Sequence, residues 1–189
     1  MFTNKKDIRR WLDNKKIEQY KINKDLTVDV FGRVDIKFSL NEVKELPVQF
    51  GKVYGHYFCS EQDLTSLKGS PYEIFGTFDC SNNLLDDLRF SPVIIHSTFD
   101  CSYNKLKSFQ TFPENIGLDL YINNNPFTPE SLLEFNTIVK GEIYSDLFPD
   151  TTSFINHINT LKNILKEKDI LSNEQVYSCI LNHSNTKRI

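Results

Sequence analysis

Apolar positions in the middle of the chain recur with a 21-residue period. The cysteines Cys59, Cys80 and Cys101 follow one another at this interval. The surrounding sequence repeats with them, as in YFCSEQDLTSL, FDCSNNLLDDL and FDCSYNKLKSF. A period of about 20 to 50 residues is typical of solenoids, in which each repeat is one unit and the units must stack to bury their apolar sides. The pattern therefore predicts about five stacked copies over residues 36–127.

Several positions of the repeat keep the same chemical character from copy to copy. Two residues before the cysteine there is an apolar column, containing Ile36, Tyr57, Phe78, Phe99 and Leu120. The cysteine column itself contains Phe38, Cys59, Cys80, Cys101 and Ile122. Three residues after it there is an amide column, containing Asn41, Gln62, Asn83, Asn104 and Asn125. Fifteen residues after it there is an aliphatic column, containing Val53, Ile74, Ile95 and Ile116.

The columns predict how each copy folds. Residues two apart lie on the same side of a strand, so the apolar and cysteine columns predict one short strand per copy in a parallel sheet. The amides are expected to pair with backbone groups that the following turn leaves inside the coil. Pro71, Pro92 and Pro113 come twelve residues after the cysteines, where each strand has already ended.

The segment before the repeats predicts a helix and short strands. Residues 4–14 favour a helix capped by Asn4, with one apolar face formed by Ile8, Trp11 and Leu12. Apolar and polar side chains alternate on either side of Gly32, in residues 26–31 and 33–38, which indicates a hairpin or two short strands. We expect residues 1–35 to close the N-terminal end of the sheet, since an open edge strand invites aggregation.

The segment after the repeats, residues 128–189, is predicted to be a helical cap. Thr128, Pro129 and Glu130 are typical of a helix start. The helix would continue to Gly141, with an apolar face of Leu132, Phe135 and Val139. Two more helices are expected over about 151–168 and 173–183. The apolar face of the first contains Phe154, Ile158, Leu161 and Leu165.

The repeat resembles a known family. Its pattern F-x-C-S-x-N-x-L-x-x-L is similar to the L-x-L-x-x-N-x-L core of leucine-rich repeats, and the following P-x-x-I resembles the short repeats of secreted enterobacterial effectors. The chain is also similar to leucine-rich proteins of large tailed phages, which share the W-L-D of residues 11–13 and a segment like that of residues 28–36. The resemblance implies an α/β leucine-rich-repeat solenoid with a parallel β-sheet and helical N- and C-terminal caps.

Composition and charge narrow the function classes. The chain has 189 residues, 39% of them hydrophobic, and a formal net charge of −3, which is ordinary for a globular protein. No apolar stretch reaches the roughly 20 residues of a membrane helix, and no secretory signal is visible. Four cysteines are too few for a disulfide scaffold, so we expect a cytoplasmic protein, in the host cytoplasm if it is encoded by a phage.

The outward side of the predicted strands holds the candidate binding residues. One outward column is expected to contain Asp35, His56, Thr77, Thr98 and Asp119. The next is expected to contain Lys37, Phe58, Asp79, Asp100 and Tyr121. Residues 26–127 hold 8 Lys and Arg against 13 Asp and Glu, a net charge of −5. We therefore predict a concave face that binds a basic protein partner. Its predicted contact residues are His56, Phe58, Asp79, Asp100, Tyr103, Asp119 and Tyr121.

Other function classes are compatible with parts of the sequence. Asp79 and Asp100 are expected to lie about 5 Å apart, a spacing that retaining glycosidases use, so a glycan hydrolase is the alternative. A structural or virion component is a third possibility. The basic residues of the first 25 positions could contact nucleic acid, although solvated helix charge is the simpler explanation.

We expect a binding protein and not an enzyme, with no cofactor. We also expect no metal, because the cysteine column faces the core. For a phage protein, inhibition of a host enzyme or defence system is the hypothesis that the resemblance suggests.

Overall fold

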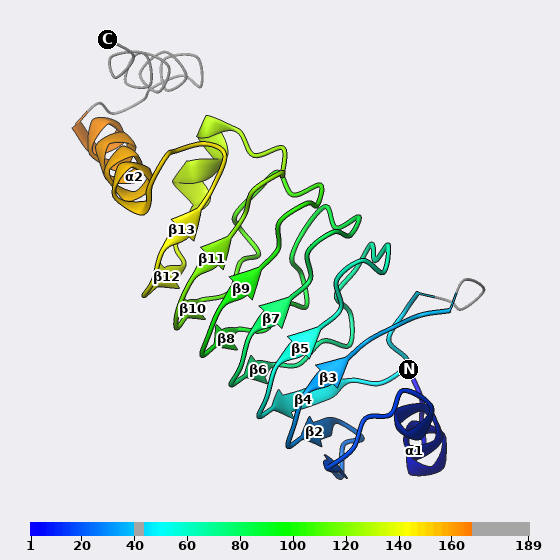
Figure 1. The fold of residues 1–189 in the computed structure, drawn as a ribbon. Helices are drawn as coiled ribbons and strands as arrows, with labels where there is room; N and C mark the ends of the chain where they lie inside the picture. The colour runs from blue at the N-terminus through cyan, green and yellow to red at the C-terminus, as the bar shows by residue number, and fades with distance from the viewer. Residues whose placement is uncertain (40–43, 168–189) are drawn as a thin grey trace.

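The computed structural model describes residues 1–39 and 44–167 (Figure 1). Within these residues the strands form two sheets. Sheet A contains β1 (Tyr20–Ile22), β2 (Val28–Val30), β4 (Phe50–Val53), β6 (Glu73–Ile74), β8 (Ile94–Ile95), β10 (Asn115–Ile116) and β12 (Ile138–Val139). Sheet B contains β3 (Val34–Asp35), β5 (Tyr57–Phe58), β7 (Phe78–Asp79), β9 (Phe99–Asp100), β11 (Leu120–Tyr121) and β13 (Ile143–Tyr144). All neighbours pair in parallel except β1 and β2, so the predicted solenoid is confirmed.

Each coil contributes two strands and not the single strand that the sequence predicted. The chain passes through sheet A, turns a corner of three residues and enters sheet B, as from β6 to β7 (Figure 1). Most of these strands are only two residues long and bury a single side chain, such as Ile74 in β6 and Phe78 in β7. A strand this short shows no alternation, which explains why the aliphatic column did not reveal a second sheet.

The step between coils is two residues longer at both ends of the stack than in its middle. Tyr57 pairs with Phe78, and Phe78 with Phe99, but the partner of Tyr57 in β3 is Val34. The Ile36 N–H donates to the Phe58 carbonyl at 2.8 Å, as the Cys59 N–H does to the Asp79 carbonyl. The predicted placement of Ile36 in the apolar column and Phe38 in the cysteine column is therefore wrong by two residues.

The same longer step changes the end of the repeat region. The helix predicted from residue 128 to Gly141 is wrong: a short 3-10 helix, η1 (Pro129–Glu134), is followed by β12 and β13. Leu120 pairs with Ile143 in β13, so one more coil extends both sheets past residue 127. Leu132 and Phe135 are buried as expected, but in the arc of this coil. We use arc for the segment that connects a strand of sheet B to the next strand of sheet A. The three-residue spacing of Leu132 and Phe135, which suggested an α-helix, fits the 3-10 helix and the residue that follows it.

The interior is a stack of equivalent side chains. The Phe78 and Phe99 rings lie parallel with centroids 5.4 Å apart, and the three repeat cysteines are buried and form no disulfide within the described residues. Within the described residues the amide column behaves as predicted, and Asn41 lies outside them. Asn104, for example, accepts from the Leu85 N–H and donates to the carbonyl oxygens of Cys80, Cys101 and Ser102. These bonds join adjacent coils and satisfy backbone groups that water cannot reach.

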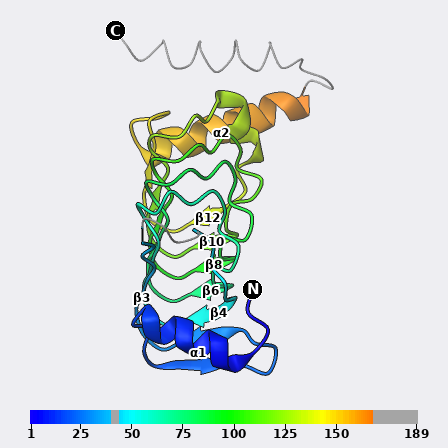
Figure 2. The same cartoon turned by 90° about the vertical axis from the view of Figure 1, so that its right-hand side faces the viewer.

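A helix lies at each end of the stack (Figures 1 and 2). Helix α1 (Lys5–Asn14) begins as predicted, because the Asn4 side chain accepts from the Asp7 N–H at 3.0 Å. It buries Ile8, Trp11 and Leu12. Of the two interpretations of residues 26–38, the short strands are correct and the hairpin is not, since β2 pairs with β1 and β3 belongs to sheet B.

Helix α2 (Thr151–Glu167) confirms the helix predicted over about 151–168. It buries Phe154, Ile158 and Leu161. The Phe154 ring contacts Phe135 at a centroid distance of 5.2 Å, so the helix packs against the last coil. The helix predicted over 173–183, and Cys179 within it, lie outside the described residues.

Candidate functional site

The outward side chains of sheet B form one row across its six strands. The strand pairing places them in the order Asp35, Phe58, Asp79, Asp100, Tyr121 and Tyr144. We call this set the acid–aromatic row. The prediction that Lys37 belongs to the row and that Asp35 lies in the column of His56 is wrong, because the longer step between β3 and β5 shifts the first strand by two positions. The row also includes Tyr144, which belongs to the coil that was predicted to be a helix.

Asp79 and Asp100 are direct neighbours at the centre of the row. In each, Oδ1 accepts the N–H and the hydroxyl of the serine two residues on, at 2.9 and 2.7 Å from Ser81 and at 2.9 and 2.6 Å from Ser102. Both serines are buried, so they support the aspartates and are not themselves contact residues. Within the described residues, each carboxylate keeps its second oxygen free for an external partner.

The two aspartates differ in their electrostatic surroundings. Burial raises the pKa of the Asp100 carboxyl above its usual value, since it removes water from the charged form. The bonds from Ser102 oppose this shift, and the negative charge of Asp79 adds to it. The pair thus carries concentrated negative charge that a cation would stabilise.

Aromatic rings flank the acidic pair on both sides. The Phe58 ring lies under the Arg33 guanidinium at 4.4 Å and stacks on His56 at 5.7 Å. On the other side, Tyr121 and Tyr144 stack with centroids 4.4 Å apart and planes within 6°. The rings are large and have few rotatable bonds, so they offer contact area at a low cost in conformational entropy.

A hollow of about 390 Å³ lies at the tyrosine end of the row. We call it the Tyr144 hollow. Its lining includes Tyr121, Ile143, Tyr144, Phe148, Pro149 and Thr151. The Phe148 ring contacts Phe154 of α2 at 5.7 Å, so the wall of the hollow is held by the last helix. Its polar lining includes Asn123, Glu142 and Asp150. The acid–aromatic row therefore ends in a concave feature with an apolar and a polar side.

Two predicted residues lie beside the row. Asp119 precedes β11, and its Oδ1 accepts the Glu142 N–H at 2.9 Å, which ties adjacent coils together. Tyr103 follows β9 in a turn, with a side chain that is 54% exposed and a φ of +54°, a region that L residues other than Asn rarely adopt. The structure thus gathers Phe58, Asp79, Asp100 and Tyr121 into one row, with His56 against it.

A second aromatic arrangement, which was not predicted from the sequence, lies at the corner between the sheets. Phe31, Tyr54, Phe75 and His96 stack in succession with centroids 5.0, 4.8 and 4.6 Å apart. The signal was present as an aromatic residue followed by glycine at 31–32, 54–55 and 75–76. The glycines allow the coils to approach, since a Cβ on Gly76 would lie 2.6 Å from the Gly55 carbonyl oxygen.

This corner also has an ion network. Glu73 accepts from His96 at 2.9 Å and pairs with Lys52 at 2.6 Å. These bonds lower the pKa of the Glu73 carboxyl, His96 contributing most. The charges of Lys52 and Glu73 are thus compensated within the chain, unlike those of the two aspartates in sheet B.

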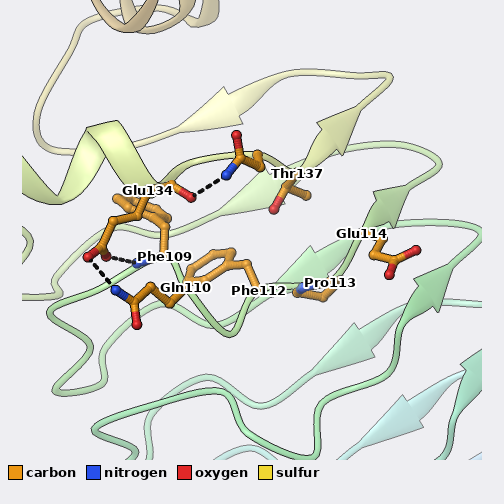
Figure 3. Close-up of a pocket in the computed structure, with 8 residues that line it drawn as sticks. Phe109, Gln110, Phe112, Pro113, Glu114, Glu134 and Thr137 are labelled. Carbon is orange, nitrogen blue, oxygen red and sulfur yellow. Dashed lines mark hydrogen bonds between the residues drawn. The ribbon is translucent and has the colours of Figure 1, made fainter. Parts of the chain in front are cut away.

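A further hollow of about 360 Å³ lies between the last two arcs (Figure 3). Phe109, Phe112 and Pro113 form its apolar side. Glu134 accepts the Phe109 N–H at 3.2 Å and the Gln110 side-chain amide at 2.8 Å (Figure 3). It also accepts from the Ser108 hydroxyl. Its carboxylate is therefore engaged in holding the arc in place.

Several chemical features bear on the other function classes. Residues 1–39 and 44–167 contain no group of three or more His, Cys, Asp and Glu side chains suited to a metal ion. Burial raises the pKa of the thiols of Cys59, Cys80 and Cys101, which disfavours the thiolate that metals and electrophiles require. No helix in the described part of the chain has the length and apolarity needed to cross a membrane.

Comparison with known proteins finds no match to this chain among family models, curated proteins or solved structures. The resemblance to leucine-rich repeats therefore rests on the repeat itself. Function has to be argued from the surface of the two sheets.

Proposed function

We propose that this chain is a protein-interaction module and that the outward face of sheet B binds its partner. The observation that carries the proposal is the acid–aromatic row. In it, Asp79 and Asp100 stand next to each other, form no ion pair within the described chain and lie between aromatic rings. Interfaces concentrate binding energy in aromatic side chains and arginine, and a pair of adjacent aspartates is complementary to a basic partner.

The charge of the repeat region indicates a basic partner. Residues 26–127 carry a net charge of −5, from 8 basic and 13 acidic residues. Complementary charge steers association and suppresses partners of the same sign. A protein with a positive patch is therefore the expected ligand, and no cofactor or metal is required for binding. On this proposal the chain is not an enzyme.

The scaffold that supports this role is, in our interpretation, a leucine-rich-repeat solenoid with helical caps. Helix α1 would cover the first coil through Trp11, whose ring lies 6.3 Å from Phe50, and α2 would cover the last coil through Phe154. Capping keeps the ends of a repeat stack from pairing with other chains. If the chain is encoded by a phage, a host enzyme or defence protein in the cytoplasm would be its target.

Site-specific photo-crosslinking tests the proposal. A photoreactive phenylalanine analogue replaces Tyr144 or Tyr103 near sheet B, and replaces Tyr72 as the matched control, which follows an arc and precedes β6 of sheet A. All three side chains are exposed aromatics. In cells that produce the chain, we expect the two sheet B positions to trap one common partner and Tyr72 not to trap it. A partner trapped from Tyr72 alone would refute the assignment of the face.

The hydrolase alternative has one observation in its favour, the raised pKa of Asp100 beside Asp79. A retaining glycosidase needs one protonated and one ionised carboxyl about 5 Å apart. We favour binding because both aspartates give an oxygen to their own serines, which anchors them to the sheet. Glycan cleavage that is lost on Asp100→Asn, with folding unchanged, would establish the alternative.

A further inference from the structure

The first acidic residue of the acid–aromatic row already holds an arginine. Arg33 donates from Nε and Nη2 to the two carboxylate oxygens of Asp35, both at 2.9 Å. The same guanidinium lies 4.4 Å from the centre of the Phe58 ring, the next member of the row. An acid and a neighbouring ring of sheet B thus form a seat for a guanidinium, which binds carboxylates by paired hydrogen bonds and also packs on aromatic faces.

The same combination recurs further along the row without a cation. Asp100 is followed by Tyr121 on the next strand, as Asp35 is followed by Phe58. The residues that correspond to Arg33 in the coils of β7, β9 and β11 are Thr77, Thr98 and Asp119, none of which is basic. Within the described residues neither Asp79 nor Asp100 forms an ion pair, and each has a free carboxylate oxygen.

The Tyr144 hollow supplies a second point of attachment on the same face. Tyr144 is 42% exposed, and the hollow beside it has an apolar side, formed by Phe148, Pro149 and Ile143, and a polar side that includes Glu142 and Asp150. Apolar or aromatic side chains that fill such hollows are typical anchors of protein interfaces. The hollow lies two strands beyond Asp100, because Tyr121 is the only member of the row between Asp100 and Tyr144.

We propose, as an extension of the proposed function, that the face binds an extended polypeptide segment with two anchors. An arginine of the partner would be seated on Asp79 and Asp100, and an aromatic or large aliphatic side chain would enter the Tyr144 hollow. Parallel strands lie about 4.8 Å apart, and Tyr144 lies two and a half strand spacings from the midpoint of Asp79 and Asp100, so the two points are separated by about 12 Å. An extended chain covers this distance in about four residues. The partner segment is therefore of the form Arg-x-x-x-aromatic and crosses the strands of sheet B.

Model peptides test the two anchors directly. The main probe is an acetylated and amidated peptide in which arginine and tryptophan are separated by three Gly and Ser residues. A second peptide has lysine in place of arginine, and a third has arginine directly before tryptophan. Amide shifts of the ¹⁵N-labelled chain give the affinity and the location of binding. We expect the main probe to bind about tenfold more tightly than the other two, with shifts in β7, β9, β11 and β13.

Variants of the chain separate the two anchors. The double variant Asp79→Asn and Asp100→Asn should remove the preference for arginine over lysine, because neutral amides replace the two carboxylates with which the guanidinium would pair. Tyr144→Ala should weaken the arginine and lysine peptides by the same factor. The matched control is Asp86→Asn, which removes one charge from an exposed position outside both sheets and should leave every affinity unchanged. Unchanged spectra away from the substituted sites show that each variant is folded.

Several results would overturn this inference. Equal affinities for the arginine and lysine peptides, or an arginine preference that survives in the double variant, would exclude the seat on the two aspartates. Equal affinities for the peptide with three residues between arginine and tryptophan and for the peptide with none would exclude the second anchor. Either result leaves the proposed function standing if Tyr144 still crosslinks a partner in cells. Crosslinking from Tyr72 alone would remove the proposed function itself.

Discussion

Replacing Asn83 of the amide column by alanine should strongly destabilise the stack. The Asn83 side chain is buried and makes five hydrogen bonds. Its Oδ1 accepts the N–H groups of Gln62 and Leu64, and its Nδ2 donates to the carbonyl oxygens of Cys59, Cys80 and Ser81. Because Cys59 and Leu64 belong to the preceding coil, the amide joins two units of the stack.

Alanine removes every one of these bonds and offers no replacement. The Leu64 N–H and the Cys59 carbonyl oxygen are buried and lose their partner, and each such group left unpaired costs about 1–3 kcal/mol. The Cys80 carbonyl oxygen keeps its bond from Asn104. Counting these two groups at about 1.5 kcal/mol each and adding about 1 kcal/mol for the small cavity, we expect a loss of about 4 kcal/mol. This is a large part of the roughly 5–15 kcal/mol that stabilises a typical domain.

Urea denaturation measures the effect. Far-ultraviolet circular dichroism reports on the whole stack, and the fluorescence of the single tryptophan, Trp11, reports on its N-terminal end. The matched control is Asn159→Ala on the exposed side of α2, where the same substitution should change stability by less than about 0.5 kcal/mol. A loss below about 1 kcal/mol for Asn83→Ala, with an unchanged denaturant slope, would refute the claim that the amide satisfies buried backbone groups.

Four further predictions concern single groups. Tyr57→Phe should raise the free energy of unfolding by about 1 kcal/mol, because the Tyr57 hydroxyl is fully buried with no hydrogen-bond partner in the described structure; equal or lower stability in a melt would contradict this. Tyr103→Asn should stabilise the fold by about 0.5–1 kcal/mol, since asparagine tolerates the positive φ, and a thermal shift in the opposite direction would show that the Tyr103 ring is structural. Carboxyl NMR should show Asp100 titrating with a pKa above the ordinary 3.8 and shifting back towards it in Asp79→Asn; because the folded-state pKa is raised, its stabilising contribution is present below pH 3.8 and is lost as the pH rises through that pKa. In a Cys179→Ser variant, the native protein should react with a thiol reagent at about pH 8 only after denaturant is added, since the repeat cysteines are buried; rapid labelling without denaturant would contradict that burial.

Part of the architecture could be predicted because it depends on local chemistry. Phe78 and Phe99 are one period apart and therefore take equivalent inward positions. Asn83 and Asn104 bond the backbone groups of turns within and next to their own coils. The start of α1 follows from Asn4, three residues from the N–H that it caps. Such features are determined by residues close in sequence or by an uninterrupted period.

The candidate site was only partly predictable, because some of its residues are not separated by the regular period. Asp79 and Asp100 could be placed together because they are separated by one uninterrupted period of the repeat. Asp35 and Tyr144 could not be placed, since the step from each of them to its partner on the adjacent strand is two residues longer than that period. Two extra residues in an arc cost little free energy and leave no mark in the pattern of apolar positions.

The amino-acid sequence by itself determined that this protein is a solenoid, which residues face its interior and which amides support its turns. Only the tertiary structure decided that each coil crosses two sheets, that one more coil follows residue 127, and that Arg33, Asp35 and Phe58 form a single cluster. The physical reason is that inward or outward direction is a property of one strand. The neighbours of a side chain on the surface depend instead on the register between coils, and this is set by packing and hydrogen bonding across the whole stack.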